Sequence, residues 1–147
     1  MSFMLPFTQG DGERFFHSVA ESAERGERVV IAAHEYGRLV GTVQVLLAMP
    51  PNQPHRAEIA KLLVEPASRG RGVGQMLMEH AERETLERGR NLLVLDTALG
   101  GAGERLYRRM GYQEVGRIPD YALYPDGKLC DTVVFYKKLA GALAEAR

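Results

Sequence analysis

A glycine-rich, basic stretch, Arg69-Gly70-Arg71-Gly72-Val73-Gly74, constrains the fold of this chain more than any other feature. It follows an apolar run, Ile59 to Val64, and opens a helical pattern that begins near Val73. Glycines let several backbone N–H groups point at one spot, and a helix start adds roughly half a positive charge there. Arg69 and Arg71 add full charges beside it. The sequence therefore predicts that a phosphate-bearing cofactor binds at this turn.

The spacing within this stretch excludes two common kinds of phosphate loop. A Walker-type loop ends in Gly-Lys-Ser/Thr, and no such triplet follows. A dinucleotide fingerprint needs a third glycine, but Gln75 and Leu77 stand at the two positions where it would fall. The pattern that fits is Arg-x-x-Gly-x-Gly, at Arg69, Gly72 and Gly74. Taken alone, the stretch is equally compatible with an ordinary glycine-rich turn from strand to helix.

A second motif accompanies the loop downstream. Leu106-Tyr107-Arg108-Arg109-Met110-Gly111-Tyr112 has the form Leu-Tyr-x-x-x-Gly-Phe/Tyr. In this order and separation, the two motifs resemble those of the GNAT superfamily of acetyl-CoA-dependent N-acetyltransferases. Three further segments are similar to the tabtoxin-resistance acetyltransferase subgroup: Arg56 to Ile59, Leu95 to Thr97 and Tyr124 to Lys128. The resemblance extends from about Glu13 to Leu139.

The resemblance implies where acetyl-CoA, as co-substrate, would bind. In this superfamily the strand before the loop splays from its neighbour, and the pantetheine arm pairs with the freed backbone. Backbone amides there also stabilise the charge that develops on the thioester oxygen. The implied cofactor-binding residues are Leu62, Leu63, Val64, Arg69, Gly70, Arg71, Gly72, Val73, Gly74 and Tyr107. The family often has an asparagine seven residues before the motif tyrosine, and Gly100 stands at that position here.

Three side chains are candidates for catalysis. Glu58 lies among apolar strand residues, where burial would raise the pKa of a carboxylate towards that of a general base, although a solvent-facing glutamate is the alternative. Asp96 ends the apolar run Leu92 to Leu95, where it could deprotonate the amine, bind it as a counter-ion, or cap a turn. Tyr107 would protonate the departing thiolate, as the resemblance implies, or pack in the core. The subgroup has a glutamate and an aspartate at the matching positions, and both are regarded there as candidate bases.

The sequence identifies the residues that would bind the amine acceptor less specifically than those that would bind the cofactor. Tyr121 and Tyr124 lie in a predicted loop, 119–128, which also contains Asp120. These side chains suit a polar, cationic small molecule, but a solvated hairpin explains them equally well. We expect Asp96, Tyr121 and Tyr124 to bind the acceptor. The histidines have no metal-ligand spacing, so we expect no metal.

Composition limits the remaining possibilities. At 147 residues, the chain is long enough for one domain with its own core, so we expect a single domain over residues 1–147. Lys plus Arg and Asp plus Glu balance at 19 each, which argues against nucleic-acid and membrane binding. The lone cysteine, Cys130, fits a reducing compartment, and no apolar run could span a bilayer, so we expect a cytoplasmic protein.

Hydrophobic periodicity and turn residues predict nine helices and strands, in an order typical of an α/β (α+β) fold. Helices are expected over 11–26, 73–88 and 102–110, and strands over 28–34, 39–48, 56–64, 91–97, 112–118 and 132–138. They describe a GNAT-type mixed, mostly antiparallel sheet with helices on both faces. The apolar run Leu92 to Leu95 is typical of a strand buried on both faces. The family's first strand and helix are missing from this pattern, so Met1 to Thr8 either forms a short edge segment or leaves an unpaired edge.

The sequence thus predicts an acyltransferase that moves the acetyl group of acetyl-CoA directly to a primary amine of a small molecule, in a ternary complex. An amino-acid-like, toxin-like or antibiotic-like acceptor fits the subgroup. Acetylation of a protein or peptide amine is the first alternative. A catalytically silent acyl-CoA-binding module is the second. The oligomeric state is open, and a homodimer is compatible with the sequence.

Overall fold

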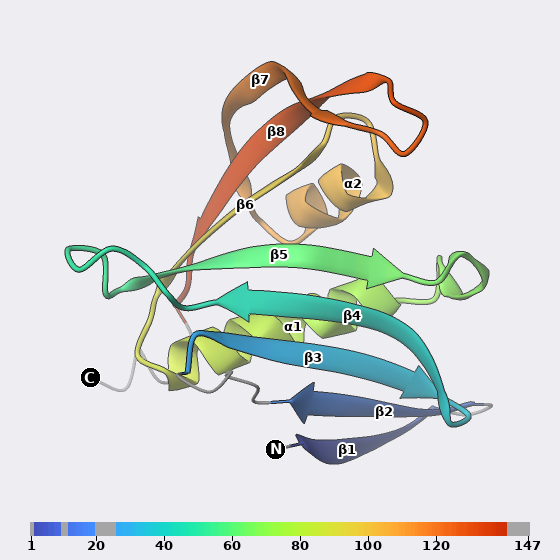
Figure 1. The fold of residues 1–147 in the computed structure, drawn as a ribbon. Helices are drawn as coiled ribbons and strands as arrows, with labels where there is room; N and C mark the ends of the chain where they lie inside the picture. The colour runs from blue at the N-terminus through green and yellow to red at the C-terminus, as the bar shows by residue number, and fades with distance from the viewer. Residues whose placement is uncertain (1, 10–11, 20–25, 141–147) are drawn as a thin grey trace.

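The computed structural model describes residues 2–9, 12–19 and 26–140. It contains one eight-stranded sheet in the order β1-β2-β3-β4-β5-β6-β8-β7 (Figure 1). Neighbouring strands are antiparallel except β5 and β6, which are parallel. The elements are β1 Ser2–Gln9, β2 Gly12–Val19, β3 Arg28–Glu35, β4 Arg38–Leu46, β5 Arg56–Val64, η1 Pro66–Ser68, α1 Val73–Glu87, β6 Leu92–Ala98, α2 Ala102–Arg109, β7 Gln113–Leu123 and β8 Leu129–Lys138. The predicted mixed, mostly antiparallel sheet is confirmed.

The helix predicted over 11–26 is wrong. Residues Gly12–Val19 form β2, whose backbone pairs with β3 from Arg14↔Glu35 to Val19↔Val30. The local pattern favoured a helix, but the backbone groups along β3 offered a ladder of hydrogen bonds, and such tertiary pairing overrides weak propensity. Ser2–Gln9 pairs in turn with β2, so the first residues form an edge strand of the sheet.

The hairpin between β3 and β4 matches its prediction. Tyr36 and Gly37 form a two-residue turn in which both φ angles are positive, 53° and 76°. Positive φ at both central residues is the requirement of a type I′ turn, whose twist matches that of the strands it joins. The turn sets Glu35 opposite Arg38 at the tip of the hairpin.

Both helices lie on one face of the sheet, here called the helix face. Its core includes Ile31, Val45, Leu93, Leu95 and Phe135 from the strands, with Leu77, Met78 and Ala81 of α1 and Tyr107 of α2. Side chains alternate along a strand, so the register pairs Glu58↔Val94 and Val94↔Tyr136 belong to the opposite, open face. No helix covers the open face among the residues that the structure describes. Within β6, therefore, only Leu93 and Leu95 are fully buried, and the prediction of burial on both faces is wrong.

β7 is longer than predicted. It continues through residues 119–123, which were expected to begin a loop, and its pairing with β8 is interrupted between Ile118 and Ala122. Asp120 in this interruption has a φ of 53°. Proline and a positive φ interrupt a ladder locally without ending the strand, because pairing resumes at Ala122↔Cys130.

Candidate active site

The central parallel pair of strands separates halfway along its length. β5 and β6 pair only at Arg56↔Leu92, Ala57↔Leu93 and Glu58↔Val94. Beyond these rungs β5 runs on through Val64 beside β4, whereas β6 pairs with β8 as far as Ala98. Figure 1 shows β6 and β8 leaving the lower part of the sheet at this point. The sheet therefore opens between the second half of β5 and the second half of β6.

A β-bulge changes which side chains in the second half of β5 face each side of the sheet. Register partners Thr42↔Leu63 and Gln44↔Ala60 leave two residues of β5, Lys61 and Leu62, opposite the single residue between them on β4. Lys61 takes up the extra residue with a φ of 55°. One additional residue reverses the in-and-out alternation of everything that follows.

The reversal decides which apolar side chains face the opening. Leu62 and Val64 line a cleft of about 510 Å³ on the helix face. Leu63, which the sequence grouped with them, is 64% exposed and does not line the cleft. The difference concerns the side chain, because a strand edge that lacks a partner still offers the backbone N–H and C=O groups of alternate residues.

The glycine-rich loop forms one end of this cleft. Gly70 and Gly72 have positive φ angles of 77° and 83°, values that residues with a Cβ rarely adopt. Gly72 is the N-cap of α1, and helix geometry leaves the first N–H groups of α1 without intrahelical acceptors. Five of the six predicted loop residues line the cleft, and Arg71 does not; the five are Arg69, Gly70, Gly72, Val73 and Gly74.

Gly74 lies where α1 and α2 approach one another. A Cβ at this position would stand 3.2 Å from Leu106 Cδ2 and 3.7 Å from Val64 Cγ2. A small side chain there is tolerable if Leu106 shifts slightly, whereas a longer one must enter the cleft. The absence of a side chain thus lets the two helix ends and β5 enclose the same space.

The two loop arginines have different surroundings. Arg69 lines the cleft, and its Nε donates a long hydrogen bond, 3.4 Å, to the carbonyl of Val64. Arg71 instead directs its guanidinium to Glu35, with Nη2 2.5 Å from Oε2. Another cation, Arg109 of α2, lines the cleft and was not singled out from the sequence. The positive charge at the cleft therefore comes from Arg69 and Arg109.

Tyr107 lines the cleft from α2 and is only 4% exposed. Its ring lies 5.6 Å from that of Tyr112, edge to face, and 6.1 Å from that of Phe135. Burial, with a smaller contribution from the negative charge of Asp96, raises the pKa of Tyr107 to about 12. The phenol is therefore protonated at neutral pH and can donate a hydrogen bond into the cleft.

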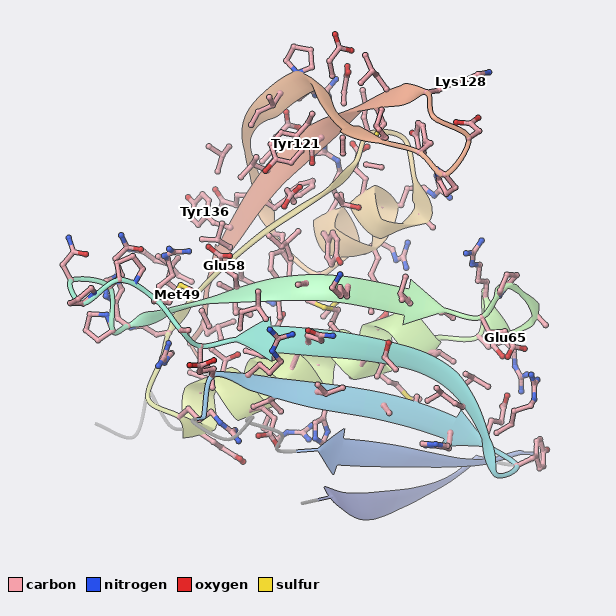
Figure 2. All side chains as sticks on the ribbon, viewed as in Figure 1. Met49, Glu58, Glu65, Tyr121, Lys128 and Tyr136 are labelled. Carbon is pink, nitrogen blue, oxygen red and sulfur yellow. The ribbon has the colours of Figure 1, made fainter. Side chains whose placement is uncertain are left out.

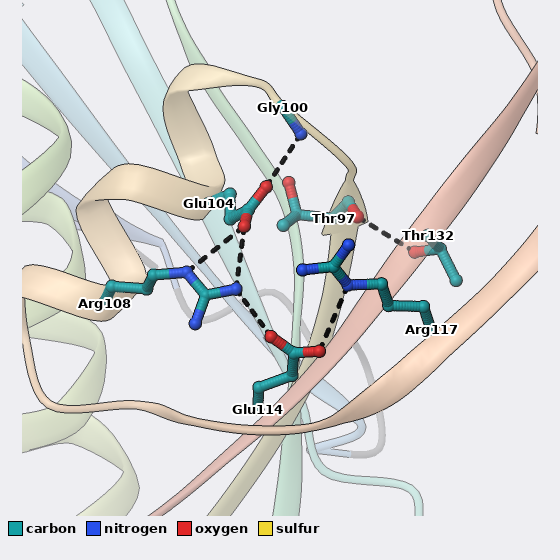
Figure 3. A network of polar contacts seen from close by, with 7 residues as sticks. All are labelled: Thr97, Gly100, Glu104, Arg108, Glu114, Arg117 and Thr132. Atoms are coloured by element: carbon teal, nitrogen blue, oxygen red, sulfur yellow. Dashed lines mark hydrogen bonds and ion pairs between the residues drawn. The ribbon is translucent and has the colours of Figure 1, made fainter.

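A polar network fixes the start of α2 (Figure 3). The backbone N–H of Gly100 donates to Glu104 Oε1 at 2.7 Å, and Arg108 Nη2 lies 2.8 Å from Glu104 Oε2 and 2.6 Å from Glu114 Oε1. The Gly100 N–H, and then Arg108, lower the pKa of Glu104. These contacts tie α2, and with it Tyr107, to β7.

Several lining residues were missed from the sequence. They are Ser68, Gln75, Thr97, Gly101, Ala102, Gly103, Leu106 and Arg109. The small residues Gly101, Ala102 and Gly103 begin α2, and an added Cβ on Gly103 would meet Thr97 Oγ1 at 2.8 Å. A run of small residues before a helix was the available signal for them.

The candidate carboxylates lie outside the cleft, on the open face. Glu58 accepts a hydrogen bond from Arg56 Nη1 at 2.6 Å, and its side chain is 40% exposed. With a cationic partner and partial exposure, Glu58 is not the isolated, buried acid that the sequence suggested. Asp96 is exposed and accepts from Thr132 Oγ1 at 2.8 Å. Figure 2 labels Glu58 and Tyr136, which the register places on either side of Val94 on the open face.

The two acceptor tyrosines lie further away. Tyr121 and Tyr124 are 54% and 41% exposed, and neither lines the cleft. Tyr121 belongs to β7 and not to the predicted loop. Among the described residues, no three His, Cys, Asp or Glu side chains are grouped as a metal ion would require. The described helices are all too short or too polar to cross a bilayer.

Comparison with known proteins relates this geometry to a family. The sequence model of the acetyltransferase (GNAT) family matches residues 2–112. Streptothricin acetyltransferase of Streptomyces lavendulae is 36% identical over 106 residues, which are 71% of this chain and 53% of that protein. The chain thus spans about half the length of this curated relative.

Solved structures show the same fold. yncA from Salmonella typhimurium, solved with its cofactor acetyl-CoA, is 18% identical with a TM-score of 0.68, over 82% of this chain and 75% of that one. Ribosomal-protein-alanine N-acetyltransferase from Brucella melitensis is 25% identical with a TM-score of 0.69, over 80% of this chain and 73% of that one.

Proposed function

The chain belongs to the acetyltransferase (GNAT) family, and we propose that it transfers the acetyl group of acetyl-CoA to a primary amine of a small molecule, directly and in a ternary complex. The observation that carries the proposal is the separation of β5 from β6 after Glu58↔Val94, beside a cleft with a glycine-rich, cationic end. A pantetheine arm needs an unpaired strand edge, and a pyrophosphate needs backbone N–H groups. This chain provides both within one cleft.

Acetyl-CoA would bind with its phosphates against the loop at Gly70, Gly72, Val73 and Gly74, where α1 begins. Arg69 and Arg109 face the same cleft and would neutralise phosphate charge from opposite walls. Beyond them, the backbone of residues 62–64 would pair with the arm. The solved complex of yncA with acetyl-CoA supports this choice of co-substrate for the fold.

Tyr107 would serve as the acid. When the amine attacks the thioester carbonyl, a C–N bond forms, and collapse of the tetrahedral intermediate breaks the C–S bond and leaves a thiolate. Because its pKa is raised to about 12, Tyr107 holds its proton at neutral pH and can donate it to that sulfur. Backbone N–H groups freed at the bulge in β5 would stabilise the oxyanion.

The acceptor would approach from the open face. Glu58 stands at the last rung between β5 and β6, where the opening begins, and Asp96 lies further along β6 on the same face. Glu58 would take the proton that the attacking amine loses, and Asp96 would hold the incoming ammonium group. Tyr121 and Tyr124 are too exposed to enclose a substrate on their own, and would contact only the outer part of an extended acceptor.

Two relatives suggest different acceptors. The name of streptothricin acetyltransferase supports an antibiotic-like amine, and its 36% identity makes this the favoured class. The alternative is a peptide amine, which the 25% identical ribosomal-protein-alanine N-acetyltransferase supports. The joint presence of Glu58, Asp96 and Tyr107 at the two sides of the opening argues against a silent acyl-CoA-binding module.

The experiment is a thiol-release assay with acetyl-CoA and a panel of amines: streptothricin-like antibiotics, amino acids, diamines and an alanine-ended peptide. We expect amine-dependent release of CoA with at least one small amine and formation of its acetamide by mass spectrometry. Calorimetry with acetyl-CoA alone is the matched control. Binding of acetyl-CoA without turnover of any amine would favour the silent module, and turnover of the peptide alone would favour the alternative acceptor.

A further inference from the structure

The tip of the β3–β4 hairpin contacts the glycine-rich loop through charged side chains. The type I′ turn at Tyr36 and Gly37 sets Glu35 and Arg38 opposite one another, so the tip carries one anionic and one cationic side chain. Glu35 pairs with Arg71, and Arg38 pairs with Glu65. Both partners belong to the connection between β5 and α1, at residues 65–72.

The first contact involves a buried acid. Glu35 is 5% exposed, and its Oε2 lies 2.5 Å from Arg71 Nη2. Arg71 directly precedes Gly72, the N-cap of α1. Because the carboxylate is buried while the Arg71 side chain is 46% exposed, the pair ties the end of the loop to the hairpin tip.

The second contact holds the other end. Arg38 Nη1 lies 2.6 Å from Glu65 Oε2 and 2.7 Å from Glu65 Oε1, while the backbone N–H of Glu65 donates to the carbonyl of Val40 at 2.8 Å. Glu65 raises the pKa of Arg38, and Glu35 adds to the effect. The four side chains therefore form one electrostatic group at the tip of the hairpin.

The part of the loop between the two contacts is the part that faces the cleft. Ser68, Arg69 and Gly70 all line it. Gly70 and Gly72 have backbone conformations open mainly to glycine, and such residues lose much conformational entropy when they are ordered. A loop of this composition needs external contacts to keep its N–H groups aimed at a ligand.

We propose that the hairpin tip is a clamp for the cofactor loop, in which Glu35 and Arg38 are positioning residues that hold residues 65–72 in the geometry that binds the pyrophosphate of acetyl-CoA. The inference rests on the proposed function, and it reassigns the Arg71 side chain from phosphate binding to loop positioning. Neither residue of the tip lines the cleft, so their effect reaches the ligand through the loop alone.

The test compares acetyl-CoA affinity in a double-mutant cycle. Glu35→Gln and Arg71→Met should each weaken binding by about tenfold, and the double variant should be little worse than either, since they break the same contact. The amine KM should stay within about twofold, because the acceptor side is untouched. If Arg71 contacts phosphate itself, Arg71→Met will weaken binding while Glu35→Gln will not, and this result would overturn the proposal.

The more exposed ion pair, Arg38 with Glu65, gives a second test that does not depend on a buried charge. Arg38→Met and Glu65→Gln should weaken acetyl-CoA binding by about threefold each and raise hydrogen exchange at residues 68–72. Arg117→Met, which removes an exposed ion pair with Glu114 on β7, is the matched control and should change neither. Unchanged affinity and exchange in both variants of the exposed pair would refute the clamp even if the Glu35 variants fail to fold.

The same experiments separate this inference from the proposed function. Amide hydrogen exchange at residues 68–72 measures how firmly the loop is held, and it needs no ligand. If the unaltered protein binds no acetyl-CoA, the proposed function fails, whereas faster loop exchange in Arg38→Met would still support the clamp. If the unaltered protein binds acetyl-CoA and all four variants bind it equally well, the clamp alone fails.

Discussion

Glu58 of β5 lies directly opposite Val94 of β6, at the last rung before the two strands separate. The rung fixes the backbone of Glu58, and Arg56, two residues earlier, holds its carboxylate at 2.6 Å. Glu58 is therefore both anchored by its strand and adjacent to the opening. A proton acceptor at this point can reach an amine that enters from the open face.

Glu58→Gln should lower kcat by on the order of a hundredfold, because glutamine keeps the shape but cannot accept the proton. Amine affinity should change little. Steady-state kinetics across pH 6 to 9 would check it, with Glu87→Gln, at the exposed end of α1, as control. A Glu58→Gln enzyme with the kcat of the unaltered protein would mean that Glu58 is not the base.

Asp96→Asn should raise the amine KM by about tenfold with little change in kcat, the signature of a lost ground-state attraction. Asparagine can still accept the hydrogen bond from Thr132, so the strand should keep its structure. Asp126→Asn, in the turn before β8, is the matched control. If Asp96→Asn instead lowers kcat by about a hundredfold while Glu58→Gln does not, the two carboxylates exchange roles.

Gly74→Glu should weaken acetyl-CoA binding more than tenfold, or about 1.4 kcal/mol, because the side chain must enter the cleft and repel phosphate. Gly74→Ala is the matched control: its Cβ would stand 3.2 Å from Leu106 Cδ2, a contact that a small movement relieves. Calorimetry would give both affinities, and thermal unfolding would verify folding. Near-normal affinity in a folded Gly74→Glu protein contradicts phosphate binding at the loop.

Tyr107→Phe should reduce kcat by about tenfold or more and leave acetyl-CoA affinity nearly unchanged, since donation to sulfur strengthens mainly in the transition state. The pKa of Tyr107 is raised to about 12, so the unaltered protein should show no descending limb from this group below pH 10. Single-turnover kinetics isolates the chemical step. An unchanged single-turnover rate would leave Tyr107 as a packing residue.

Alkaline stability offers a test that needs no substrate. Burial raises the pKa of Tyr107 to about 12, so the folded state holds this proton more tightly than the unfolded chain, whose tyrosines titrate near pH 10. The stabilisation is complete below pH 10 and falls by about 1.4 kcal/mol per unit as pH rises towards 12. Tyr107→Phe should therefore flatten the decline in a denaturant titration at pH 10 to 12. Tyr124→Phe, at an exposed tyrosine, should leave the slope of the free energy of unfolding against pH unchanged.

Short-range signals predicted most of the fold around the cleft. The glycines at Gly70 and Gly72 and the helix from Val73 follow from backbone conformations that their own residues favour, and Gly37 marks the turn in which Tyr36 also takes a positive φ. The association of the loop with the Tyr107 motif also followed from order and spacing. These elements needed no knowledge of their partners.

Long-range contacts account for what the sequence did not predict. Gly12–Val19 became a strand through pairing with β3, and Leu63 faces away because the bulge at Lys61, two residues earlier, changed the alternation. Arg71 turned to Glu35, which lies 36 residues away in the chain. Periodicity along one segment cannot report a partner that arrives from elsewhere in the fold.

The bulge at Lys61 and the length of β5 are coupled. If the same residues paired with β4 without a bulge, Leu63 would turn towards the cleft and Leu62 and Val64 would turn away, whereas loss of Lys61 together with the bulge would leave all three directions unchanged. Substitutions among apolar residues at these positions would keep the direction of every side chain. Diverging relatives should therefore gain or lose the bulge and one residue together, and agreement between the bulge and the length of this segment is a better mark of a working site than conserved letters.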